Sequence, residues 1–205
     1  MNDFQRQVLI GCCLGDISFN VYNTQKARIQ MCQSVKYQEY LNHKYEIFKD
    51  LCNTPPVVKV NDKYPSIYFN TVLSKELYDF SKLFFNEGIR GVPQNIKDLL
   101  TPISLAFWFM DDGTSSYIAK RPRQLFRRAT IMMCTDRYSI SEVESLVDAL
   151  NTKFGIDCHR VSSPSMNGRN RIYIGTRSAQ KFFDIIEPYI PPVMRYKIKR
   201  PLKVK

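Results

Sequence analysis

The chain repeats part of itself, and this repeat constrains its fold more than any other feature of the sequence. The segment VLIGCCLGDIS, residues 8–18, is similar to SLAFWFMDDGT, residues 104–114, and Asp16 aligns with Asp112. Further along, KARIQMCQS is similar to RATIMMCTD and SIYFNT is similar to RIYIGT, in the same order. A period of about 100 residues is far longer than that of a solenoid repeat. The sequence therefore predicts two related halves, residues 1–97 and residues 98–205.

Each half shows the same order of predicted elements: helix, two strands, helix, two strands, helix. Thr101 followed by Pro102 is a favourable helix start, because Thr caps the first turn and Pro is tolerated there. Ser139 and Glu142 form a capping box before a later helix. The segment ARIQM alternates between apolar and polar side chains, which is the period of a half-buried strand. We therefore expect an α+β fold built from two pseudo-symmetric αββαββα halves.

An acid ends the apolar helix of each half. Asp16 and Asp112 face the negative ends of their helix dipoles, a placement that is unfavourable by about 0.3–1 kcal/mol. Gly113 is expected to end the second helix in the left-handed conformation. If the two helices pack side by side, the carboxylates meet, and a divalent cation with oxygen ligands relieves their repulsion. A simple Asp-Gly turn would explain the second acid but not the recurrence of the first.

The charge of the chain indicates a polyanionic partner. Its net charge of +11 and pI near 9.4 fit nucleic acid or an anionic membrane surface. No apolar run approaches the roughly 18 residues needed to span a bilayer, and acids flank the apolar stretch after Val8, so we expect no signal peptide. The 6 cysteines lack C-x-x-C spacing and there are only 2 histidines, which argues against zinc. Two carboxylates sharing Mg²⁺ on a basic chain predict phosphodiester hydrolysis.

The two acid-tipped segments, LIGCCLGD and LAFWFMDDG, resemble the signature helices of the LAGLIDADG homing endonucleases. Two motifs in one chain are similar to the monomeric, two-motif branch of that family. The resemblance implies an antiparallel β-sheet saddle with the signature helices at the central interface. It also implies a staggered double-strand break in a long, specific double-stranded DNA target, which promotes homing of the host intron. The implied cofactor is Mg²⁺, with Mn²⁺ or Ca²⁺ able to substitute for binding.

The resemblance also assigns roles to residues of the site. The carboxylates of Asp16 and Asp112 and the carbonyls of Gly15 and Asp111 would bind the metal, whereas the Asp111 side chain receives no role. Phe107 stands where the family has a small residue, so close packing of the two helices must depend on the glycines of the first helix, Gly11 and Gly15.

Two basic residues follow the last helices of the halves. By resemblance, Lys197 supports catalysis, and Arg90 stands at the equivalent place in the first half. Arg stabilises phosphate charge but stays protonated and does not readily accept a proton. For both residues, simple contact with the DNA backbone is an equal alternative.

The strand faces opposite the apolar positions are expected to read DNA bases, because two-stranded ribbons fit the major groove. In the first half they comprise Lys26, Arg28, Gln30, Lys59, Asn61, Ser66, Tyr68 and Asn70. In the second half they comprise Arg128, Thr130, Arg160, Ser162, Arg171 and Tyr173. Phosphates are expected to be contacted by the loop residues Arg121, Arg123, Arg127 and Arg169 and by the basic C-terminal tail.

Two other functions remain open on the same fold. One is an RNA maturase that assists splicing of its host intron, with intron RNA as the partner. The other is a DNA-binding regulator without catalysis. In each case we expect an intracellular protein of a reducing compartment, an organelle or the cytoplasm, that is neither secreted nor membrane-bound.

Overall fold

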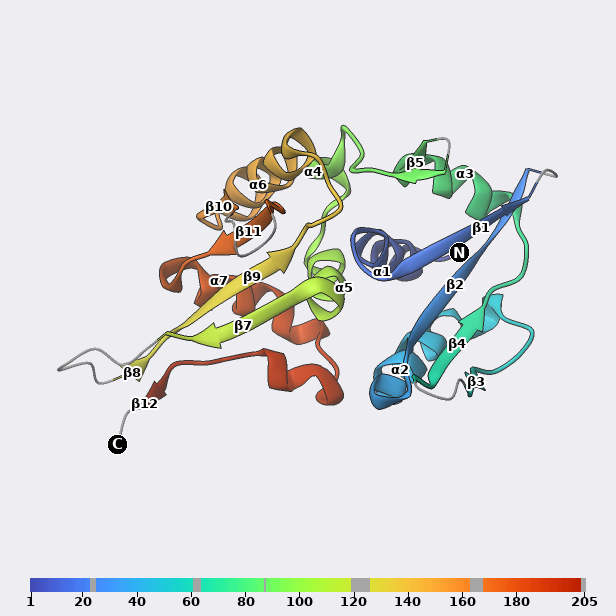
Figure 1. Cartoon of the computed structure of the whole chain (residues 1–205), viewed down its shortest axis with the longest axis horizontal. Coiled ribbons are helices and arrows are strands. Elements are labelled where there is room, and N and C mark those ends of the chain that lie inside the picture. The colour runs from blue at the N-terminus through green and yellow to red at the C-terminus, as the bar shows by residue number, and fades with distance from the viewer. Residues whose placement is uncertain (23–24, 61–63, 87, 119–125, 163–167, 204–205) are drawn as a thin grey trace.

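The computed structural model describes residues 1–22, 25–60, 64–86, 88–118, 126–162 and 168–203 (Figure 1). The first half contains α1 (Asp3–Leu14), β1 (Ile17–Tyr22), β2 (Lys26–Ser34), α2 (Gln38–Phe48), β3 (Val57–Lys59), β4 (Ser66–Asn70) and α3 (Lys75–Phe84). The second contains α5 (Pro102–Asp112), β7 (Gly113–Tyr117), β8 (Phe126–Arg127), β9 (Ala129–Cys134), α6 (Ile140–Phe154), β10 (Cys158–Val161), β11 (Arg171–Ile174) and α7 (Thr176–Ile186). The αββαββα order of both halves is therefore confirmed, with β8 as an addition.

Short elements join the two halves, and two 3₁₀ segments and a short strand follow α7. The connection consists of β5 (Phe85–Asn86), β6 (Ile89–Arg90) and α4 (Ile96–Leu99). After α7, the chain forms the 3₁₀ segments η4 (Glu187–Tyr189) and η5 (Pro192–Lys197), and then β12 (Leu202–Lys203). Two further 3₁₀ turns, η1 (Val35–Tyr37) and η2 (Lys49–Leu51), flank α2. The boundary at residues 97 and 98 stays a prediction.

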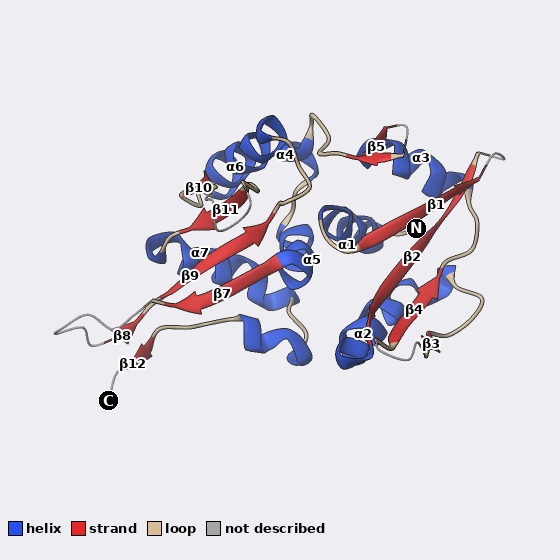
Figure 2. Ribbon diagram, viewed as in Figure 1, coloured by secondary structure: helices blue, strands red, loops and turns tan. Residues whose placement is uncertain are grey.

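The strands of each half form their own antiparallel sheet. Among the described residues, one four-stranded sheet has the order β1-β2-β4-β3 and the other has the order β10-β11-β9-β7. In β2 the buried residues are Ala27, Ile29 and Met31, and in β9 they are Ala129, Ile131 and Met133, as the alternation predicted. Figure 2 shows helices against one side of each sheet, so the apolar face of each is covered and the other is left open.

The two motif helices form the centre of the molecule. Figure 1 shows α1 and α5 side by side between the sheets, and they are in contact. Residues 8–14 of α1 and 104–110 of α5 are all buried, as expected for helices that are apolar on every side. At their crossing, a Cβ on Gly11 would lie 2.3 Å from the carbonyl oxygen of Ser104 and 2.9 Å from Cβ of Phe107. The predicted dependence of this packing on Gly11 is thus confirmed.

The predicted helix starts are confirmed, but one predicted helix end is wrong. Capping boxes join Thr101 to Ser104 and Ser139 to Glu142. Gly113, however, has φ −87° and ψ 145°, which is extended and not left-handed, because α5 passes directly into β7. Glycine is needed there for space, since a Cβ would lie 2.7 Å from the carbonyl oxygen of Phe109. None of the described helices is long and apolar enough to cross a membrane.

Candidate active site

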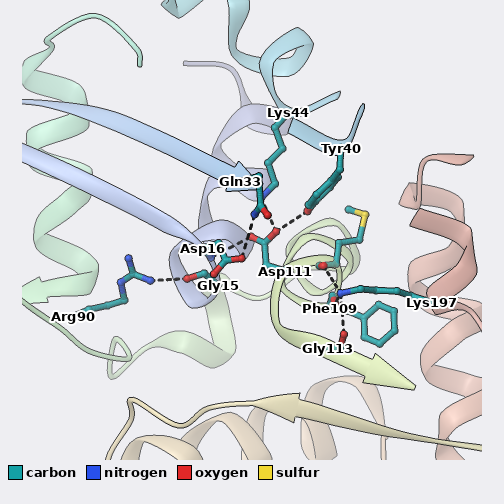
Figure 3. Close-up of polar contacts among 11 residues, drawn as sticks. Gly15, Asp16, Gln33, Tyr40, Lys44, Arg90, Phe109, Asp111, Gly113 and Lys197 are labelled. Atoms are coloured by element: carbon teal, nitrogen blue, oxygen red, sulfur yellow. Dashed lines mark hydrogen bonds and ion pairs between the residues drawn. The ribbon is translucent and has the colours of Figure 1, made fainter. Parts of the chain in front are cut away.

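The two acid-bearing helix ends meet, as the repeat predicted. The backbone N–H of Asp16, just past the end of α1, donates a hydrogen bond of 3.3 Å to Oδ2 of Asp111 in the last turn of α5 (Figure 3). The Asp16 carboxylate is exposed, and its Oδ2 accepts a hydrogen bond of 3.2 Å from Nε2 of Gln33. Close packing makes this meeting possible, because a Cβ on Gly15 would lie 2.5 Å from Cβ of Asp111.

The carboxyl of Asp112 lies in a strongly acidic environment. Burial and the neighbouring charges of Asp16 and Asp111 raise the pKa of this half-buried carboxyl to about 7, although Arg137 and Lys197 act in the opposite direction. Such a shift is the expected result when a carboxyl is partly buried and other carboxylates lie close to it. A divalent cation would supply the missing charge.

Lys197 binds the C-terminal end of α5. Its Nζ donates hydrogen bonds to the carbonyl oxygens of Met110, at 2.5 Å, and Gly113, at 2.9 Å (Figure 3). The ammonium thus compensates the helix end that carries two acids. Burial lowers the pKa of Lys197, although Asp111 and Asp112 act to raise it. Loss of the proton is therefore easier than from an exposed lysine.

Arg90 occupies the equivalent place at the end of α1. Its guanidinium donates a hydrogen bond of 2.6 Å to the carbonyl oxygen of Gly15 (Figure 3). It donates a second one to the carbonyl oxygen of Ile17. Because a carbonyl oxygen has two lone pairs, Gly15 keeps one of them for another partner. Burial, followed by the charge of Arg137, lowers the pKa of Arg90.

Two hollows open onto Asp16. The larger, of about 530 Å³, is also lined by Ser18, Gln30, Arg90 and Arg137, and the smaller, of about 170 Å³, by Tyr40, Asp111 and Lys197.

Two residues beside Asp16, Arg137 and Gln33, were not among the predicted site residues. Gln33 carried a signal, since it is a polar residue at a position that continues the buried face of β2. Arg137 follows the equivalent strand of the second half, and nothing in the sequence distinguished it from other surface arginines.

The donor set fits a hard divalent cation that is shared with a substrate. Among the described residues, no group of three or more His, Cys, Asp or Glu side chains forms a closed metal cage. Mg²⁺ typically uses one or two carboxylates together with water and substrate phosphates, and does not need such a cage. The two converging carboxylates, the uncompensated charge at Asp112 and the adjoining hollow meet this description.

Most of the predicted base-reading residues lie on the open sheet faces. The strand register places Arg28, Gln30, Lys59, Ser66, Tyr68 and Asn70 on one open face, and Thr130, Arg171 and Tyr173 on the other. The register also adds neighbours that the sequence reasoning missed, namely Ser18, Asn20, Thr114 and Ser116. Lys26, Arg128 and Ser162 are exposed at strand ends. Asn61, Arg121 and Arg123 lie outside the described residues.

The placement predicted for Arg160 is wrong. Arg160 pairs with the buried Ile172, so it lies on the helix-covered face, where it binds Glu144 of α6 at 2.8 Å. His159 takes the open position instead, with its ring 5.4 Å from that of Tyr173. A prediction that turns Val161 inward places Arg160 on the open face, whereas Cys158 is the buried residue of this strand.

Three other predicted DNA-contacting arginines have partners within the protein. Arg171 and Arg169 both bind the carboxylate of Asp136, at 2.8 and 3.4 Å. Arg127 lies over the ring of Tyr117, with 5.4 Å from its guanidinium carbon to the ring centroid. These contacts hold the side chains beside the open face of the second sheet.

Paired acid-ended helices between two open-faced sheets define a nucleic-acid-cleaving enzyme of the LAGLIDADG type. Residues 6–182 match the model of the LAGLIDADG DNA endonuclease family, and the chain belongs to this family. It is 28% identical over 211 residues to "DNA endonuclease I-ChuI" of Chlamydomonas applanata, covering 95% of this chain and 94% of that protein. The predicted family and enzyme class are confirmed.

Solved structures agree with the fold. The homing endonuclease I-WcaI, bound to its DNA recognition sequence, is similar with a TM-score of 0.83 and 24% identity over 97% of this chain and 87% of that one. The structure of I-DmoI in complex with DNA and Mn has a TM-score of 0.51 and 15% identity, covering 89% of this chain and 96% of that one. At these identities the likeness confirms the α+β saddle fold.

Proposed function

We propose that this chain is a site-specific homing endonuclease that makes a staggered double-strand break in a long DNA target and so promotes homing of its host intron. The observation that carries the proposal is the convergence of Asp16 and Asp112 at the ends of two paired helices, beside open sheet faces. Membership of the family supports the reaction class, and the named activity of I-ChuI supports DNA as the substrate.

In this proposal the cation is held by the carboxylates of Asp16 and Asp112, with the carbonyl oxygens of Gly15 and Asp111 as further ligands. The chemistry supplied by a bound divalent cation is activation of water and polarisation of the scissile phosphate. The presence of Mn in the I-DmoI complex supports a divalent ion. We propose Mg²⁺ as the ion used for cleavage, with Mn²⁺ or Ca²⁺ able to replace it in binding.

Lys197 and Arg90 are assigned different parts in the reaction. Lys197, whose pKa burial has lowered, lies where it can accept or return a proton near the acid at the end of α5. Arg90 remains protonated, holds the turn between Gly15 and Ile17, and presents positive charge to a phosphate in the larger hollow. Contact with the DNA backbone alone is the alternative for each.

The two open sheet faces are proposed to lie in the major groove, one face for each half of the target. Side chains of the faces would read bases, and the arginines beside the second sheet would bind phosphates. Because both acids belong to one chain, we propose that a monomer with halves 1–97 and 98–205 suffices for both strands. All 6 cysteines are free, which supports a reducing compartment, an organelle or the cytoplasm.

The decisive experiment uses DNA that carries the intronless junction of the host gene. With Mg²⁺ present, the protein should cut both strands at one site, and Asp16→Asn or Asp112→Asn should abolish cutting while DNA binding persists. Arg177→Gln, which changes an exposed charge away from the acids, serves as a matched control and should cut normally. Specific binding without cutting would indicate a regulator, and preference for the intron RNA would indicate a maturase.

A further inference from the structure

The Asp111 side chain, which the motif left without a role, is completely buried at the centre of the site. Its exposed fraction is 0%, and that of its partner Lys44 is 1%. Oδ1 accepts hydrogen bonds from Nζ of Lys44 at 2.5 Å and from the hydroxyl of Tyr40 at 2.8 Å, and Oδ2 accepts the backbone N–H of Asp16 at 3.3 Å (Figure 3).

All three donors come from the other half of the chain. Asp111 belongs to α5, whereas Lys44 and Tyr40 lie on α2 and Asp16 follows α1. The position equivalent to Asp111 in the first half is Gly15, which has no side chain and packs against Asp111. Donors of the first half therefore bind a side-chain acceptor of the second half, whereas Gly15 has no side chain that could accept the reverse hydrogen bonds. This difference breaks the two-fold symmetry of the site.

Stability alone is a weak explanation for this ion pair. A buried ion pair is often no more stabilising than apolar residues of similar volume, because two charges must leave water. Nζ of Lys44 lies 2.5 Å from Oδ1 of Asp111, and both side chains are buried. This close, buried contact keeps the Asp111 carboxylate in place.

We propose that Asp111, fixed by Lys44 and Tyr40, is a positioning residue that holds the main chain at Asp16 and thereby aims the Asp16 carboxylate. The exposed Asp16 follows a helix end, where the backbone is prone to fraying. Its backbone bond to Asp111 and its side-chain bond to Gln33 restrain it from two sides. The inference rests on the proposed role of Asp16 as a cation ligand.

Two double variants of equal net charge distinguish a positioning role of Asp111 from a purely stabilising one. Lys44→Met combined with Asp111→Asn removes the ion pair but retains a side-chain oxygen for the N–H of Asp16. Lys44→Met combined with Asp111→Leu has nearly the same volume and no acceptor. Both replace the buried pair by neutral groups, so their comparison isolates the hydrogen bond to Asp16.

The first measurement needs neither metal nor DNA. Amide hydrogen exchange by ¹⁵N NMR should show the Asp16 N–H exchanging about tenfold faster in the Leu variant than in the Asn variant, because only the latter keeps a partner for it. The second measurement is the affinity for Mn²⁺ alone, followed by water-proton relaxation, which should be several-fold weaker in the Leu variant. If the Leu variant does not fold, Asp111→Ala with Lys44→Met takes its place.

Equal exchange rates and equal Mn²⁺ affinities in the two double variants would overturn the positioning role. Asp16→Asn distinguishes this failure from failure of the proposed function. If Asp16→Asn loses Mn²⁺ binding and cleavage while the double variants behave alike, Asp16 is a ligand that Asp111 does not position. If Asp16→Asn still binds Mn²⁺ and cleaves, the proposed role of Asp16 as a cation ligand fails, and the positioning role that rests on it fails too. If the wild type does not cleave DNA, the proposed function fails, whereas the exchange rates of the Asp16 N–H still test the positioning.

Discussion

Replacing Asp112 by Asn should abolish cleavage and at the same time stabilise the metal-free protein at neutral and alkaline pH. The carboxyl has its pKa raised from 3.8 to about 7, first by burial and then by Asp16 and Asp111. Between these two values the folded state holds a proton that the unfolded state has lost. Stability therefore falls as the pH rises from about 4 to about 7, and the Asn variant escapes this loss.

The size of the effect follows from the same shift. Linkage over a pKa change from 3.8 to about 7 gives the variant an additional advantage of about 2–3 kcal/mol at pH 8 compared with pH 5. Because the group is partly exposed, solvent screening reduces the expectation to on the order of 2 kcal/mol. Urea unfolding at the two pH values, without metal, measures the difference directly.

Two controls sharpen this experiment. Asp136→Asn should destabilise the protein equally at pH 5 and pH 8, because hydrogen bonding to Arg171 lowers the pKa of Asp136 from 3.8, so that its stabilisation is fully present above 3.8 and is lost only as the pH falls through the lowered value. Added Mg²⁺ should stabilise the wild type at pH 8 more than the Asp112→Asn variant, since a ligand that binds the folded state stabilises it. An advantage of Asp112→Asn that is the same at both pH values would refute the reasoning.

Three further predictions test the packing, the lysine and the binding surface. Gly11→Ala should destabilise the protein by about 1–3 kcal/mol in urea unfolding, because its Cβ would lie 2.3 Å from the Ser104 carbonyl oxygen; unchanged stability would contradict the helix packing. Lys197→Met should slow single-turnover cleavage by about 10²–10⁴-fold with little loss of DNA binding, whereas Lys75→Met, at an exposed lysine of α3, should not. The logarithm of DNA affinity, measured by fluorescence anisotropy, should decline linearly and steeply with the logarithm of salt concentration, and a flat dependence would exclude a phosphate-dominated interface.

The parts of the fold that the sequence predicted are those with a local physical cause. Alternation in the segment ARIQM follows from one face of β2 being buried, and the caps at Thr101 and Ser139 satisfy backbone groups within one turn. The meeting of Asp16 with the end of α5 was predictable for a different reason. A duplicated unit implies a pseudo-two-fold axis, and equivalent residues near such an axis lie close together.

The features that could not be predicted depend on which face of a short strand is buried, or on residues that are far apart in the sequence. In β10, Cys158 and Val161 are both apolar but have opposite parity, so alternation in a four-residue strand could not decide which face is buried. Lys44 and Asp111 are 67 residues apart, and only the packing of α2 against the site brings them together. Asp-Gly is typical of a turn, and only the direct entry into β7 makes Gly113 extended.

The places where the two halves differ lie around the acids themselves. Lys197 binds carbonyl groups at the end of α5, whereas the equivalent turn after α1 is bound by Arg90, which does not readily give up its proton. Gly15 faces Asp111 across the interface. The end of α1 therefore has a side-chain hydrogen-bond acceptor supplied by α5, whereas Gly15 has no side chain to supply one to the end of α5. The two acids therefore have different basic neighbours and different restraints, although they sit on equivalent helices. Since the sheets keep the common pattern, the two halves are alike in their scaffold and differ around the two acids.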